Sequence, residues 1–363
     1  MKNSRKILIT FFISTIIFIG TLSSFNFIID PFQQYRKPTL YKTFYTEYNE
    51  RSLNAGLAKT RSYSSIITGS SMTQNFLISK ASEILPNPIK LTISGATAHE
   101  INLILNTAFK SNNEIKNILI GLDVYALSGK PNTLKNGDDS IPIYLYDYNY
   151  FNDIFYLANI TTIQESIRSL LNKYMKNKND LNWNYENMYQ WQHIFSDNDF
   201  SEEKILKQFS SKVEKNTNIQ VSTNNDFDFK NLKNSFEFNF ISLIQNNPNT
   251  NFIFFYPPYS VFSYKQWKEN FILNDIIQFK KYMTKRLSEF SNVAIYDFQS
   301  AIEITTNLNN YKDFTHYHQN INNWMIEQIK ENNYLVTKDN IDEHLENIRK
   351  QIEEYDLNKL GLD

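Results

Sequence analysis

The chain has 363 residues, of which 41% are hydrophobic, so it is long enough for one large or two ordinary domains with a substantial core. Its formal net charge of −1 argues against the basic footprint of nucleic-acid-binding proteins, and we expect no nucleic-acid partner. The absence of cysteine excludes disulfides, thiolate zinc sites and a cysteine nucleophile, and it leaves the cellular compartment open.

The N-terminus has the pattern of a membrane anchor. Lys2, Arg5 and Lys6 precede an uncharged, mostly apolar run at 7–29, which at about 1.5 Å per residue spans about 34 Å, enough to cross the hydrocarbon core of a bilayer. A cleavable signal peptide is the alternative, but no clear small-x-small cleavage site follows, so we favour an uncleaved single-pass anchor at 1–29. The positive flank predicts a cytoplasmic N-terminus and a main domain that is periplasmic or extracellular.

Residues 30–62 are predicted to form a juxtamembrane segment, and from residue 63 short apolar runs alternate with helix-like segments. The apolar runs are continuous, as in parallel strands buried on both faces, and they lie at 65–68, 89–93, 117–124, 251–256 and 293–296. Helices are predicted at 75–85, 98–111, 232–245, 267–290 and 321–331. This alternation predicts an α/β domain at 63–337 with a doubly wound, flavodoxin-like and mostly parallel sheet.

The alternation stops between about 128 and 229, which we interpret as a large insertion rather than a separate domain. It contains an amphipathic segment near 160–174 and an aromatic cluster, Trp183, Tyr185, Tyr189 and Trp191. This cluster is suited to stacking on sugar rings, although packing a small core within the insertion is the commoner use of such residues. Residues 338–363 are predicted to form a C-terminal extension with a charged helix at 341–357.

Two short motifs carry side chains suited to catalysis. Gly69-Ser70-Ser71 ends the apolar run at 65–68, at the strand edge where ligands bind in parallel sheets. Asp313 and His316 stand three residues apart near the C-terminus, and a serine nucleophile needs such a base with an orienting carboxylate. The alternative interpretation is structural: Gly-Ser-Ser is then a loop with a serine N-cap, and Asp313 and His316 are turn residues before a helix.

Taken together and in this order, the two motifs resemble those of the SGNH (GDSL-type) hydrolase superfamily, over about 63–331 without the insertion. The resemblance implies that Ser71 is the nucleophile, His316 its base and Asp313 the orienting residue, with Ser70 in the place of the family's Asp. The anchor combined with Gly-Ser-Ser is similar to the membrane-anchored proteins of teichoic-acid D-alanyl transfer and to the SGNH-like proteins of alginate and cell-envelope O-acetylation.

Two further family positions concern the oxyanion hole and pocket. Gly95 fits the glycine whose N–H binds the oxyanion, whereas Asp123 stands where the family has an Asn donor. An ionised carboxylate cannot donate a hydrogen bond, so Asp123 is protonated, points away, or leaves that role to another group. A structural role, in which Asp123 caps or ties a loop, is at least as common. Tyr259, in the Tyr-Pro-Pro-Tyr stretch after the fourth strand, is a further pocket candidate.

The resemblance implies a membrane-anchored serine esterase or O-acyltransferase that faces away from the cytoplasm and modifies a cell-envelope polysaccharide. Its substrate would be an acyl ester or an acylated polysaccharide, and its partner a multi-spanning membrane acyltransferase. We expect no cofactor, and the five histidines show no metal-ligand spacing. The alternative is a non-catalytic SGNH-like module that binds a glycan or a membrane acyltransferase.

Overall fold

Five parallel strands form the centre of the fold in a computed structural model, which describes residues 2–46, 48–135, 137, 141–175, 181–215 and 225–355. They are β1 (Ser65–Thr68), β2 (Pro88–Lys90), β3 (Asn117–Gly121), β4 (Asn251–Tyr256) and β5 (Val293–Asp297). Their order in the sheet is β2-β1-β3-β4-β5, and every neighbouring pair is parallel. This is the order of flavodoxin-like doubly wound sheets, in which the β1/β3 position is the topological switch point. The predicted α/β class with a parallel sheet is confirmed.

The strands lie close to their predicted positions. β1 and β4 have the predicted bounds, whereas β2 and β3 end three residues earlier than expected. The chain after β2 nevertheless continues beside β1, because Leu91 N–H donates to the Ile67 carbonyl and Ile93 N–H to the Gly69 carbonyl. All four residues of β1 are buried, as expected of a strand that is covered on both faces.

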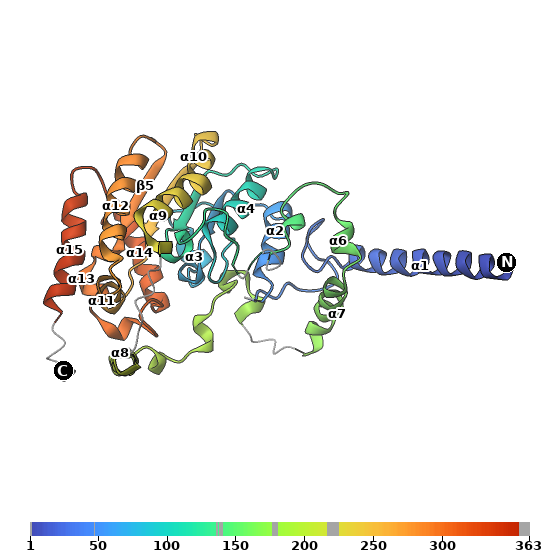
Figure 1. Cartoon of the computed structure of the whole chain (residues 1–363), viewed down its shortest axis with the longest axis horizontal. Helices are drawn as coiled ribbons and strands as arrows, with labels where there is room; N and C mark the ends of the chain where they lie inside the picture. Colours follow the sequence, from blue (N-terminus) through green and yellow to red (C-terminus); the bar gives the residue numbers. More distant parts are fainter. Residues whose placement is uncertain are drawn as a thin grey trace.

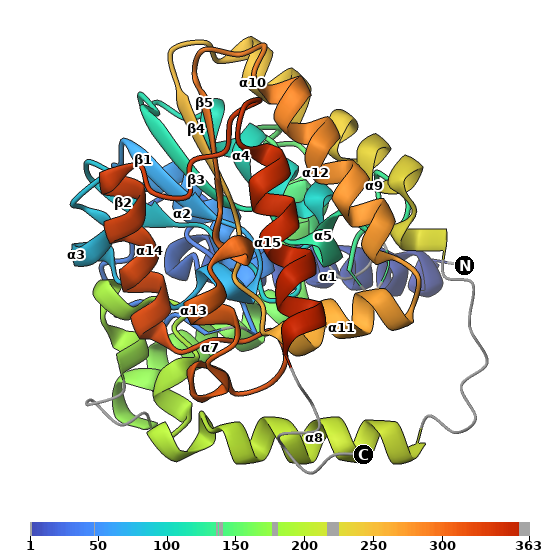
Figure 2. The same cartoon turned by 90° about the vertical axis from the view of Figure 1, so that its left-hand side faces the viewer.

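Helices cover both faces of the sheet (Figure 2). Contacts join α4, α9, α10 and α12 into one group and α3 with α14 into another. The N-terminal half contains α1 (Lys2–Ile29), α2 (Glu50–Thr60), α3 (Ile78–Ala81), α4 (Ala98–Phe109), α5 (Val124–Leu127), α6 (Ile154–Leu157) and α7 (Ile160–Met175). The C-terminal half contains α8 (Glu202–Lys215), α9 (Phe229–Phe236), α10 (Ser242–Asn246), α11 (Val261–Glu269), α12 (Leu273–Leu287), α13 (Ile302–Thr305), α14 (Gln319–Glu331) and α15 (Ile341–Glu354). The last two residues of the helix predicted at 341–357 lie outside the described residues.

Three of the predicted helices are interrupted. The helix expected at 75–85 is wrong: only the four residues of α3 are helical there, because Asn75 accepts distant backbone N–H groups from Trp191 and Gln192 instead of starting a helix. The helix expected at 267–290 is two helices, α11 and α12, separated where Phe271 adopts a left-handed φ of 61°. The helix expected at 232–245 contains a π-helical segment at Glu237–Ile241 between α9 and α10.

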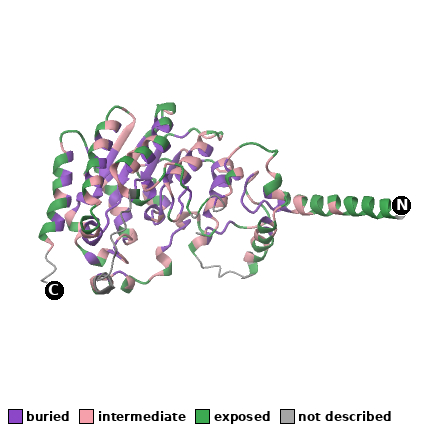
Figure 3. Cartoon of the chain, viewed as in Figure 1, coloured by how far each residue is buried: buried purple, intermediate pink, exposed green. Residues whose placement is uncertain are grey.

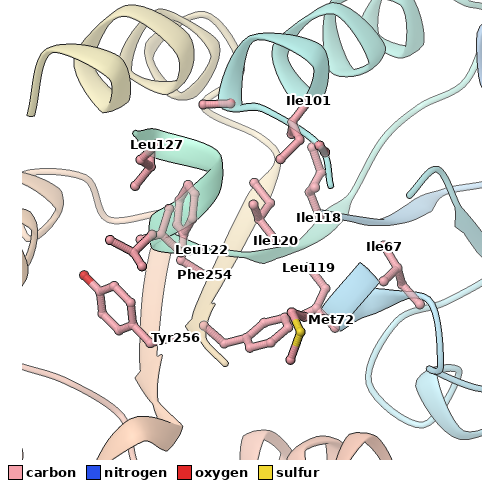
Figure 4. Packing of buried hydrophobic residues seen from close by; sticks show 14 of the residues in the cluster. Ile67, Met72, Ile101, Ile118, Leu119, Ile120, Leu122, Leu127, Phe254 and Tyr256 are labelled. Carbon is pink, nitrogen blue, oxygen red and sulfur yellow. The ribbon is translucent and has the colours of Figure 1, made fainter. Parts of the chain in front are cut away.

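The main core lies between the sheet and its helices. Figure 4 shows Ile67 of β1, Leu119 of β3 and Met72, which comes from the turn after β1, within this core. Met72 is 3% exposed, so burial of its side chain fixes the turn that carries its neighbour Ser71.

Helix α1 extends away from the domain (Figures 1 and 3). Residues Ser4–Ile29 are long and apolar enough to cross a membrane, with a mean hydropathy of 2.1 in the most apolar window, none of which is buried by the rest of the chain. Its last turns contact the domain, where Asn26 is fully buried. The Asn26 amide donates to the Leu157 carbonyl, and the Ser166 hydroxyl donates to the Asn26 side-chain oxygen.

The segment after α1 packs on the domain. Asp30 accepts hydrogen bonds from the Tyr35, Gln34 and Arg36 backbone N–H groups and from the Tyr156 hydroxyl. Burial raises the pKa of Asp30, and the lowering effect of these bonds is smaller. Farther along, a Cβ on Gly56 of α2 would lie 1.9 Å from the Phe32 carbonyl oxygen, so only a glycine lets the segment approach this closely. The predicted juxtamembrane region is therefore an ordered part of the folded domain.

Candidate active site

The turn after β1 is built around a glycine that has no room for a side chain. Gly69 has a φ of +142°, and a Cβ there would lie 2.8 Å from the Thr73 Cγ2 atom. Ser70 caps the 3₁₀ turn Ser71–Thr73, because its Oγ accepts from Met72 N–H and its carbonyl accepts from Thr73 N–H. Ser71 thus stands at the C-terminal end of β1, next to the switch point of the sheet, with its side chain partly exposed.

The structure brings together the three residues that the two motifs predicted. The Ser71 Oγ lies 2.9 Å from His316 Nε2, although 245 positions separate the residues in the chain. His316 Nδ1 lies 2.9 Å from one Asp313 carboxylate oxygen and 3.0 Å from the other. These distances form a continuous hydrogen-bonded line from carboxylate to imidazole to hydroxyl.

The surroundings of Asp313 assign the protons along this line. Burial raises the pKa of Asp313, but hydrogen bonds from the His316 ring and from the His316 and Thr315 backbone N–H groups outweigh it and hold the pKa well below its usual range. A carboxylate accepts only, so His316 Nδ1 carries the proton and Nε2 is left to accept from the Ser71 hydroxyl. The side chains of His316 and Asp313 are 30% and 33% exposed, so solvent reaches the imidazole.

The loop that carries Asp313 and His316 is closed on itself and tied to the serine turn. Tyr311 and Tyr317 form an isolated antiparallel bridge around it, and Lys312 N–H donates to the His316 carbonyl. The buried Tyr317 hydroxyl donates to the Met72 carbonyl at 3.0 Å, so the residue after His316 is bonded to the residue after Ser71. The distance between base and hydroxyl is thereby fixed by backbone-anchored contacts.

Asp123 faces a buried network directly behind this turn. One of its oxygens accepts from the Ser70 hydroxyl at 2.8 Å, and the other accepts from the Tyr259 hydroxyl at 2.5 Å and from Tyr125 N–H at 2.9 Å. Burial, together with the charge of Asp123, raises the pKa of Tyr259 far above its usual value, so its hydroxyl remains a donor. Asp123 therefore caps α5 and holds Ser70 and Tyr259, and all three partners use it as an acceptor.

Gly95 lies on the segment that continues β2 past the serine turn. It has a left-handed φ of 58° and is exposed beside Lys135. Within the described part of the chain, neither the Gly95 N–H nor the Ser71 N–H donates to another protein group. Both are thus unused donors near the C-terminal edge of the sheet, and their joint use as an oxyanion hole stays a prediction.

Trp191, which the sequence analysis named only as a member of the aromatic cluster, contacts the site directly. Its indole Nε1 donates to the Ser71 carbonyl at 2.9 Å, and its ring meets the His316 ring edge-on with 5.4 Å between centroids. Lys312 lies over the same indole, 5.3 Å from its centroid. The sequence placed Trp191 only within an aromatic cluster, because 120 positions separate it from Ser71 and no local spacing marks the pairing.

The other members of that cluster pack away from the site. Trp183 contacts Phe44, while Tyr185 and Tyr189 both contact Tyr45. These contacts attach the long β3–β4 connection to the segment after α1. The three side chains do not form a small core within the connection, as the sequence had led us to expect.

The arrangement has the parts needed for nucleophilic acyl transfer: a hydroxyl, a base in reach, an orienting carboxylate and unused N–H donors. Among the described residues, no group of three or more His, Asp or Glu side chains is arranged to hold a metal ion. No protein-family model matches the chain, and no curated protein is significantly similar to it. The geometry of these side chains therefore carries any functional assignment.

Proposed function

We propose that this chain is a membrane-anchored serine esterase or O-acyltransferase of the SGNH type. The observation that carries the proposal is the hydrogen-bonded line from Asp313 through His316 to Ser71. The Ser71–His316 contact joins parts of the chain that lie 245 positions apart, and the Asp313 carboxylate, three residues before His316, fixes the tautomer of that base.

The proposed reaction follows from the positions of the protons. His316 Nε2 takes the hydroxyl proton as the Ser71 Oγ attacks the carbonyl carbon of an acyl ester, and the carbonyl oxygen becomes an oxyanion held by the Ser71 and Gly95 N–H groups. The bond to the leaving alcohol breaks as His316 returns the proton to it, which leaves an acyl-Ser71. A sugar hydroxyl or water then gives its proton to His316 as its oxygen attacks the acyl carbon, and His316 passes that proton to the Ser71 Oγ as the acyl–Oγ bond breaks, which restores Ser71.

The direct test is turnover by the purified full-length chain. We expect hydrolysis of a small aryl acetate, and transfer of the acetyl group to a polysaccharide hydroxyl if the physiological acceptor is a glycan. Hydrolysis that persists while no glycan changes the product ratio would assign an esterase. A complete lack of turnover, with tight binding to a glycan, would overturn the proposal in favour of a binding module.

That second candidate has one observation in its favour. Asp123 occupies the position at which the resemblance leads one to expect an Asn donor, and all its contacts in the fold use it as an acceptor. Loss of one oxyanion donor commonly costs about 10²- to 10³-fold in rate. A slow or inactive SGNH-like module that binds a glycan or a multi-spanning membrane acyltransferase is therefore the alternative.

For the location we propose a single membrane span with a cytoplasmic N-terminus, since Lys2, Arg5 and Lys6 flank the start of the apolar run. The bonds of Asn26 to Leu157 and Ser166 support an anchor that is retained, because cleavage after the helix would remove a buried part of the domain. A reporter that is active only outside the cytoplasm, fused to the C-terminus, should be active. A well-expressed but inactive fusion would show that the protein has the opposite orientation.

A further inference from the structure

The part of the chain nearest α1 exposes an unusual number of large apolar side chains. Outside α1, seventeen such side chains are exposed among the described residues, and nine of them fall between Tyr148 and Tyr174. These nine define the α6–α7 surface: Tyr148, Tyr150, Phe151, Ile154, Phe155, Ile160, Ile167, Leu171 and Tyr174. A concentration of this kind on a folded domain marks a surface that contacts something apolar.

Helix α7 shows that this exposure is not random. Its inward face carries polar residues, because Thr162 and Ser166 are 2% and 0% exposed. Its outward face carries Ile160, Ile167 and Leu171, which are 72%, 46% and 45% exposed, together with the exposed polar residue Gln164. A helix that packs on a water-exposed domain normally has the reverse arrangement, with its apolar face inward. The surroundings of the outward face are therefore expected to be apolar.

The contacts of Asn26 place this surface relative to α1. An apolar helix crosses the hydrocarbon core of about 30 Å in about 20 residues, and 20 residues counted from Ile7 end at Asn26. Asn26 is bonded to Leu157 at the end of α6 and to Ser166 in the middle of α7, each at 2.8 Å. Figure 1 shows α6 and α7 at the end of the domain from which α1 emerges. If α1 spans the bilayer, these helices lie at the level of the lipid–water boundary.

Basic side chains lie near the same end of α1. The Arg36 guanidinium lies 4.3 Å from the centroid of the Phe27 ring, in the last turn of α1. Lys37 and Lys42 of the same segment are exposed. Basic side chains and aromatic rings together are typical of the headgroup region of a membrane, where cations meet lipid phosphates and rings lie between the polar and apolar layers.

We propose that the α6–α7 surface is embedded in the interface of the bilayer that α1 crosses, so that lipid covers its exposed apolar side chains. The inference goes beyond the proposed enzyme function, and it rests on α1 spanning a membrane. The domain is then held against the membrane at two adjoining places instead of being free to swing on a single helix.

The absence of cysteine in the chain permits a direct test by spin labelling. Single variants Phe155→Cys and Ile160→Cys, each at a well-exposed side chain, are labelled in the full-length protein and reconstituted in phosphatidylethanolamine–phosphatidylglycerol vesicles. We expect collisions with dissolved oxygen to increase severalfold and collisions with a water-soluble nickel complex to fall severalfold, relative to an exposed label in water.

Two further labels make the outcomes distinct. Figure 1 shows α11 and α12 at the end of the domain opposite α1. Phe271→Cys, at a 75% exposed residue between these two helices, should therefore stay accessible to nickel. Ile16→Cys, in the middle of α1, should give the deepest signal. A deep label at Ile16 with water-accessible labels at Phe155 and Ile160 would overturn the proposal, and would point to a protein partner for this surface. A shallow label at Ile16 would overturn the membrane span itself and the proposal with it, while the triad chemistry would remain unaffected.

Discussion

Replacing Ser71 by Ala is expected to lower ester turnover by about 10⁴- to 10⁶-fold, since the proposed attacking oxygen is removed while the rest of the site stays in place. A fluorophosphonate should modify the wild-type protein at Ser71 and leave the variant unmodified. The variant should keep nearly all of its stability, because Ser71 is partly exposed and, among the described residues, its hydroxyl bonds to His316 alone. Turnover and mapping of the labelled residue by mass spectrometry measure these effects.

The adjacent serine is a matched control for that variant. Ser70→Ala removes a buried hydroxyl, its bond to Asp123 and the bond that it accepts from Met72 N–H, so it should cost about 1 to 3 kcal/mol of stability. It should still be labelled at Ser71, because the labelled oxygen and its base are unchanged. Modification at Ser70 in the wild-type protein, or full activity of Ser71→Ala, would show that the nucleophile has been assigned to the wrong residue.

Replacing Asp313 by Asn is expected to lower ester turnover by up to about 10⁴-fold. The amide can donate to His316 Nδ1, which favours the tautomer with its proton on Nε2, and a protonated Nε2 cannot accept from Ser71. Initial rates at neutral pH measure the effect. Equal activity of the variant and the wild-type protein would mean that Asp313 has only a structural role in its turn.

Stability separates the catalytic effect of Asp313 from unfolding. The pKa of Asp313 is lowered in the folded protein, so its ionised form stabilises the fold at neutral pH, and this contribution is lost as the pH falls toward the folded-state pKa. The wild-type protein should therefore have a larger unfolding free energy than Asp313→Asn at neutral pH, and the two values should converge in strong acid. Thr315→Val removes one hydroxyl donor to Asp313 but keeps the carboxylate, and it should retain most of the activity.

Elements whose cause is local could be predicted from the sequence. The apolar runs of β1 and β4 gave the correct bounds, because a strand buried on both faces requires an unbroken apolar stretch. The uncharged run after Lys6 likewise predicted α1. Asp313 and His316 could be paired from the sequence since a tight turn brings residues three apart together, as their 2.9 Å contact shows.

Contacts between distant segments were decided only by the tertiary structure. The sequence named Ser71 and His316 from a resemblance, but the 2.9 Å between them depends on the order of parallel strands and on the bond from Tyr317 to Met72. No local pattern distinguished Trp191, which contacts Ser71, from the other members of its aromatic cluster, which contact Phe44 and Tyr45.

The helix expected after Ser71 is a case in which long-range contacts overruled a local prediction. Its residues are compatible with a helix, yet Asn75 is held in a different conformation by N–H groups from the β3–β4 connection. The sequence did not decide whether Asp123 is protonated, points away or leaves the donor role to another group. In the structure it accepts from Ser70 and Tyr259, because β1, β3 and β4 end side by side. Local patterns determined where the strands and the two motifs lie in the chain. The packing of the parallel strand ends determined which of their side chains meet. Such meetings depend on long-range contacts, which compete with local conformational preference.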